Sequence, residues 1–196
     1  MTEQLNLKQL ERKAWQLYHQ DGLVEVFLGI LLVLAFFAGT AGEHRFFFYI
    51  PMLLTGPALL LAKRIITVPR MGQVKFGAER KAKQRKLRLV AVTVFAITVA
   101  LLVATILRVP WVPHQPVVVA IGFGGMIALV FATFAYMKDF PRLYVVGLVI
   151  GAAFTLAELL DSSIPLLAAG AIVLSVGLAI LIAFVRRYPV PSAGHA

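Results

Sequence analysis

Six long apolar stretches restrict what this chain can fold into more than any other feature of its sequence. Each stretch is close to the roughly 17 to 25 residues that an α-helix needs to cross the hydrocarbon core of a bilayer. Because no water is present there to hydrogen-bond the backbone, such stretches have to be helical. The sequence therefore predicts transmembrane helices at residues 26–42, 46–62, 89–107, 117–137, 143–160 and 164–185.

The composition excludes an ordinary soluble domain. Of the 196 residues, 60% are apolar and only 14% are charged, whereas soluble domains are about half apolar and about a quarter charged. Six spans with short connections use the whole length, so we expect residues 1–196 to form a single all-α integral membrane bundle. The absence of cysteine also excludes thiol nucleophiles and thiolate metal sites.

The distribution of Lys and Arg predicts the orientation of these helices. Of the 19 such residues, all but Arg45 and Arg108 fall in the N-terminal segment, after the second span, after the fourth span or after the sixth. Cytoplasmic segments carry the excess of Lys and Arg, so we expect a multi-pass protein of the cell membrane, plasma or inner, with both termini in the cytoplasm. An odd number of spans would place basic connections on both sides, which favours six.

A cleaved signal peptide is the competing interpretation of the first apolar stretch, because residues 38–42 are small enough for processing. The segment before it is long and mixed in charge, unlike that of a signal peptide. We instead expect residues 1–22 to form a cytoplasmic amphipathic helix, which lies in the membrane interface or packs on the cytoplasmic end of the bundle. Its apolar positions recur at helical spacing, at Leu7, Leu10, Ala14 and Leu17.

The short outer connections predict three helical hairpins, formed by spans one and two, three and four, and five and six. Small residues on spans four and five would let helices approach closely, either inside the bundle or at a homodimer interface. Packing inside the bundle is favoured, because six spans already supply partners. The small residues are Gly122, Gly124, Gly125, Ala128 and Ala132 on span four, and Gly147, Gly151 and Thr155 on span five.

The connection at residues 63–88 is the most distinctive polar segment, with ten basic residues and a single acid, Glu79. We expect a turn or short extended piece at 68–77 and a helix at 78–88. A basic cluster beside a span on the cytoplasmic side is typical of contact with anionic lipid headgroups. A phosphorylated ligand or an acidic membrane or cytoplasmic protein is the alternative, and nucleic acid is not expected without an aromatic platform. The candidate lipid- or partner-binding residues are Arg70, Lys75, Arg80, Lys81, Lys83, Arg85, Lys86 and Arg88.

Part of this segment carries a resemblance. The sequence Pro69-Arg70-Met71-Gly72-Gln73-Val74-Lys75-Phe76 resembles a motif in a group of small polytopic membrane proteins of bacteria and archaea that has no assigned activity. The group is also similar in opening with a Glu-Arg-Lys-Ala helix, here residues 11–14, and an Asp-Gly turn, here residues 21–22. The resemblance covers about a quarter of the chain. It implies a prokaryotic membrane protein and assigns no catalytic residue.

Glu25 lies near the cytoplasmic end of the first span, four residues after Asp21, so the two carboxylates are expected to share a helix face. An ionisable residue in a span indicates function, because burying its charge at mid-bilayer costs about 3 kcal/mol. Near the end of a span, the same residue can instead pair with a Lys or Arg of the cytoplasmic connections. Glu25 is therefore a candidate for proton or ion coupling, and a structural ion pair is the alternative.

Glu158 and Asp161 are expected at the outer end of the fifth span, where they can face the same way. We treat them as candidates for ion coupling together with Glu25. No His-x-x-His or related spacing is present, so no metal site is predicted. In the structural alternative, Glu158 pairs with an outer arginine, and Asp161 or one of the two serines after it caps the sixth span.

The sequence contains no nucleophile elbow, no phosphate-binding loop and no dinucleotide-binding glycine pattern placed after a strand. No catalytic residue or cofactor is predicted, and an enzyme is not favoured. The favoured function is a non-enzymatic membrane protein that binds anionic lipid or a partner protein through its basic cytoplasmic face. A small ion-coupled transporter or carrier is the alternative.

Overall fold

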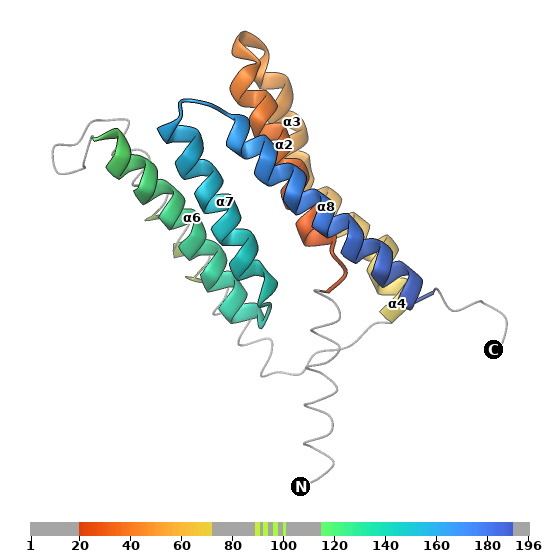
Figure 1. The fold of residues 1–196 in the computed structure, drawn as a ribbon. Coiled ribbons are helices and arrows are strands. Elements are labelled where there is room, and N and C mark those ends of the chain that lie inside the picture. Colours follow the sequence, from red (N-terminus) through yellow and green to blue (C-terminus); the bar gives the residue numbers. More distant parts are fainter. Residues whose placement is uncertain are drawn as a thin grey trace, which may run out of the picture. The chain divides into compact units, whose positions relative to one another are not determined.

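The computed structural model describes residues 20–71 and 115–189, together with seven positions between 89 and 100. All regular structure in these residues is helical, which confirms the all-α prediction (Figure 1). The elements are α2 (Leu23–Thr40), the 3₁₀ turn η1 (Gly42–Arg45), α3 (Phe46–Ala62), the π-helical turn η2 (Lys63–Thr67), α4 (Val68–Met71), α6 (Pro116–Lys138), α7 (Arg142–Leu159) and α8 (Ile164–Arg187).

Among the described residues, five helical stretches are long and apolar enough to cross a membrane. Four are α2, α6, α7 and α8, and the fifth runs without a break from Gly42 to Arg70. They match five of the predicted spans to within three residues at most ends. The predicted third span lies largely outside the described residues, although its seven described positions are helical. The amphipathic helix expected at 1–22 also lies outside them, except for its last three residues.

One boundary prediction is wrong. Residues 63–71 were expected to begin the polybasic connection, with a turn or extended piece from 68, but α3 continues through η2 and α4 to Met71. The physical reason lies in contacts between residues that are distant in the sequence. Lys63 and Thr67 are buried, and their polar side chains bind inside the protein instead of facing water, so the helix extends past the end of the apolar stretch.

The chain forms two compact units, Met1–Lys75 with Leu167–Ala196, and Phe76–Leu166. In the first unit, η1 joins α2 to α3 and the two helices pack against each other. The arrangement of the spans in three hairpins stays a prediction. Helix α8 also packs closely against α2 (Figure 1), and successive contacts move backwards along α8 as α2 advances, so the two run antiparallel. The facing pairs are Gly22 with Gly177, Gly29 with Leu174, and Val33 with Gly170.

The second unit contains α6 and α7, which pack along each other on either side of a tight turn at Asp139, whose φ is 52°. Small residues make this approach possible. A Cβ at Gly124 would collide with Gly151 and Thr155 of α7, and one at Gly147 would collide with Phe131 of α6. Packing inside the bundle is thus confirmed for these residues of the predicted small-residue rows.

Two other glycines of span four behave differently. A Cβ at Gly122 or Gly125 would meet no atom within 4 Å. The face of α6 that carries these two glycines does not contact α7 at these positions. The alternative role of the small residues, a homodimer interface, stays a prediction.

Candidate functional site

The turn that leads into α2 is built by Asp21 and Gly22. Gly22 has a φ of 78°, a left-handed conformation that favours glycine. A Cβ at this position would also lie 2.6 Å from the carbonyl oxygen of Gly177 in α8. The turn directs the Asp21 side chain back toward α2, where its Oδ1 accepts a hydrogen bond of 3.1 Å from the Leu23 amide. One of the amides left unpaired at the start of a helix is thereby satisfied.

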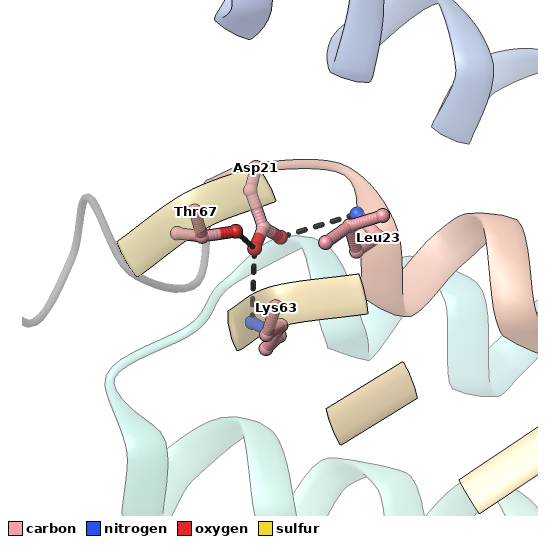
Figure 2. Close-up of polar contacts among 4 residues, drawn as sticks. All are labelled: Asp21, Leu23, Lys63 and Thr67. Carbon is pink, nitrogen blue, oxygen red and sulfur yellow. Dashed lines mark hydrogen bonds and ion pairs between the residues drawn. The ribbon is translucent and has the colours of Figure 1, made fainter. Parts of the chain in front are cut away.

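The second oxygen of Asp21 binds the end of the α3 stretch. Its Oδ2 accepts a hydrogen bond of 2.7 Å from the Thr67 hydroxyl and lies 3.2 Å from the Lys63 ammonium nitrogen (Figure 2). Lys63 and Thr67 are four residues apart in η2, so one face of this turn holds both donors. Asp21 therefore ties the start of α2 to the end of the α3 stretch through a single carboxylate.

The residues that make these contacts are buried, which increases the effect of each contact on stability. Asp21 and Thr67 are 0% exposed, Glu25 is 1% exposed and Lys63 is 5% exposed. Glu25 lies one turn into α2 and also acts electrostatically on Lys63. We call Asp21, Glu25, Lys63 and Thr67 the Asp21 cluster. Removing one partner from a buried ion pair leaves an uncompensated charge, which is far more costly than at a surface.

The cluster coincides with the π-helical turn. The Val68 amide bonds to the Lys63 carbonyl five residues back, instead of to the residue four back as in an α-helix. Turns of this kind occur mostly as single interruptions of α-helices and are frequent at functional sites. Pro69 follows directly and has no amide hydrogen to donate. Beyond it, Arg70 Nη1 donates a bond of 2.6 Å to the Ile66 carbonyl.

The predicted site residues fall into separate places. Glu25 lies in the cluster, where its charge acts on Lys63. Its ion-coupling role and the alternative of a structural ion pair both stay predictions. Asp21 does not share a helix face with Glu25, because α2 begins only at Leu23. Arg70 is half-buried in α4. The remaining lipid- or partner-binding candidates lie outside the described residues: Lys75, Arg80, Lys81, Lys83, Arg85, Lys86 and Arg88.

Glu158 and Asp161 belong to the second unit, and both are exposed at the end of α7. Asp161 has a φ of 45° in the turn before α8. The Ser162 hydroxyl oxygen accepts a hydrogen bond of 3.3 Å from the Ile164 amide, so one of the residues proposed to cap this helix does so. Within the described ranges, no three His, Asp or Glu side chains form a group that could hold a metal ion.

Sequence reasoning missed the roles of Lys63 and Thr67. Both were assigned to the basic connection, and Thr67 follows Asp21 by 46 positions, so no local pattern joins them. One available signal was their spacing of four residues immediately after an apolar stretch, which places two polar groups on one helix face.

The described residues of the first unit also separate into two differently charged ends. The antiparallel packing of α8 on α2 brings the C-terminal end of α8 to the end that holds the Asp21 cluster. Three exposed arginines lie there: Arg64, Arg186 and Arg187. We call this the basic end. At the other end, η1 exposes Arg45 beside Glu43, and the Arg45 Nε bonds locally to the Gly42 carbonyl at 2.9 Å.

Comparison of the chain with protein-family models, with curated proteins and with solved structures found no match.

Proposed function

We propose that this chain is a non-enzymatic, six-span protein of a prokaryotic cell membrane that binds anionic lipid headgroups through a basic cytoplasmic face. The observation that carries the proposal is the separation of exposed charge in the first unit. Arg64, Arg186 and Arg187 lie at the basic end, whereas the end at η1 exposes one arginine beside an acid. Such an asymmetry favours the basic end as the cytoplasmic one.

The direction of α8 supports six spans. Because α8 runs antiparallel to α2, a chain that crosses a bilayer in both helices does so in opposite directions, which agrees with an even number of crossings. Five helical stretches among the described residues are long and apolar enough to cross. The proposal assigns the sixth crossing to the apolar stretch at 89–107, which has the length that one span needs.

Anionic lipid is the ligand class that this face fits best. A basic residue near an anionic membrane surface contributes about 1 kcal/mol of attraction, so the exposed arginines would add to the charge of the rest of the connection at 63–88. Lys63 is the exception, because its ammonium is buried against Asp21. The proposal therefore assigns lipid binding to Arg64 and not to its neighbour Lys63.

The test measures lipid retention by native mass spectrometry of the full chain in mild detergent. We would compare an anionic with a zwitterionic lipid for a variant carrying Arg64→Gln, Arg186→Gln and Arg187→Gln. At about 1 kcal/mol per charge, each removed arginine should weaken anionic-lipid binding by about fivefold. Arg45→Gln, at the other end, is the matched control and should change nothing.

A second variant addresses the remainder of the basic connection, with Gln at Arg80, Lys81, Lys83, Arg85 and Lys86. Unchanged lipid retention in both multiple variants would contradict the proposal. If an acidic polypeptide is retained instead and is lost from the variants, the face binds a partner protein and not lipid.

The ion-coupled carrier is kept as a second candidate because of the burial of the Asp21 cluster. Glu25 is almost inaccessible and lies in the first turn of α2, one of the helices long enough to cross a membrane. Ionisable residues in such places mark ion and proton pathways by default. A carrier should move protons into liposomes loaded with a pH-sensitive dye, and Glu25→Gln should abolish the flux. Glu43→Gln, with its exposed carboxyl at η1, is the control. Flux that survives Glu25→Gln would exclude this role for Glu25.

A further inference from the structure

The π-helical turn η2 lies at a position where its geometry affects the following segment. A π-turn closes with a bond between residues five apart, one residue more than an α-turn. Each residue of an α-helix turns by about 100° around its axis. Conversion of η2 into an α-turn would therefore rotate α4 by about 100° relative to α3.

Asp21 contacts both ends of this turn. Its Oδ2 binds Lys63, the first residue of η2, and Thr67, the last one (Figure 2). The carboxylate is itself held by the Leu23 amide at the start of α2, and the adjoining Gly22 packs on α8. The contact thus comes from a part of the first unit that is anchored by two other helices.

We infer that Asp21 sets the rotational register of α4 by holding η2 in its π-helical form. Loss of the Asp21 contacts then lets the turn relax to an α-helix, and the residues after it take new angular positions. The inference does not depend on lipid binding, because it concerns only which side chains of 63–71 face the protein interior.

The burial pattern defines what relaxation would change. Lys63 and Thr67 are buried, Pro69 is exposed, and Ile66 and Val68 are half-buried. When the π-turn relaxes to an α-turn, each later residue moves forward by one position around the helix axis. Residue 68 then takes the exposed position that residue 69 now holds. Position 66 turns toward the buried place that Thr67 now holds. Relaxation therefore has opposite effects at the two half-buried positions.

Thiol labelling measures this directly, because the natural chain has no cysteine. Ile66→Cys and Val68→Cys would be introduced singly into the full chain and labelled in membranes with a small water-soluble maleimide. Arg64→Cys, at an exposed position, provides the reference rate. With Asp21→Asn in the same chain, we expect labelling at position 68 to rise severalfold and labelling at position 66 to fall severalfold.

Three other results would overturn the inference. Faster labelling at both positions would mean local unfolding and not rotation. A rise at position 68 and a fall at position 66 in a Pro69→Ala chain, but not in Asp21→Asn, would mean that the proline sets the register instead. Proline lacks an amide hydrogen and crowds the preceding turn. Thr67→Val removes one contact and keeps the ion pair, so it should shift both rates in the same directions by less. Unchanged rates in Asp21→Asn would also contradict the inference.

Discussion

At the scale of single residues, Asp21 organises the described part of the first unit more than any other side chain. Its two oxygens accept from an amide, a hydroxyl and an ammonium group, and all three donors belong to buried residues. The neighbouring Arg64 has the same formal charge as Lys63 but faces outward. Two adjacent basic residues of one sequence pattern thus have different roles, one inside the protein and one on its surface.

The first prediction concerns stability. Asp21→Asn or Lys63→Met should each lower the free energy of unfolding by about 3 to 5 kcal/mol, because each leaves one member of a buried pair uncompensated. The double variant should lose less than the sum of the two single variants. Denaturant titration in detergent measures these values. Arg64→Met is the matched control and should stay within about 0.5 kcal/mol of the natural chain; a loss there as large as for Lys63→Met would disprove the assignment.

At the scale of elements, α2 and α8 pack most closely at glycines, which have no side chain to separate the two backbones. The α2 and α8 backbones approach so closely that a Cβ at Gly29 would lie 2.6 Å from the Leu174 amide nitrogen, and one at Gly177 equally close to the Val26 nitrogen. In a bilayer, apolar side chains gain little by leaving lipid, so close van der Waals contact supplies much of helix association. The two glycines of α8 that meet α2 lie seven residues apart, at 170 and 177, and this spacing keeps both on one face of α8.

The second prediction uses this contact. Gly29→Ala should lower stability by about 1 to 3 kcal/mol, because the added methyl group forces two packed backbones apart. Gly56→Ala in α3 is the control, since a Cβ there meets no atom within 4 Å and alanine favours helix. Thermal unfolding in detergent compares the two. Equal melting temperatures would mean that α2 and α8 do not touch at Gly29.

At the scale of the whole molecule, the direction of the helices determines which connections share a side of the membrane. The start of α2, the end of the α3 stretch and the end of α8 lie together at the basic end of the first unit. In the second unit, Lys138 and Arg142 flank the turn between α6 and α7, while the exposed Glu158 and Asp161 follow α7 at its other end. Within the described residues, each unit by itself therefore has one end that is more basic than the other, a charge distribution of the kind that the positive-inside rule describes.

The third prediction tests the six-span topology. Single cysteines replacing Glu43 and Asp161 should react with a membrane-impermeant maleimide added outside intact cells. Cysteines replacing Asp139 and Ser192 should react only after the membrane is opened, because the proposed six-span topology assigns both positions to the cytoplasmic side. The natural chain is the blank, as it contains no thiol. Labelling of Glu43→Cys and Ser192→Cys from the same side would rule out an even number of spans.

Much of the architecture could be predicted from sequence alone. Helix limits agreed closely for α6 and α7, because the length of apolar sequence needed to cross a bilayer is a local requirement. The start of α2 and the end of the α3 stretch agreed less well. There, Asp21 and Lys63 are polar and resemble connection residues, and only their mutual contact allows them to be buried.

The sequence by itself determined that this chain is helical and built to span a membrane, since lipid imposes that state on every long apolar stretch whatever its neighbours are. The tertiary structure alone decided which of two adjacent, chemically similar residues turns inward: Lys63 and not Arg64, Gly124 and not Gly125. Consecutive helix positions differ by about 100° around the axis, and the composition of a helix contains no information on its rotation. That rotation depends on the partner packed against it, and here the partners are distant in sequence.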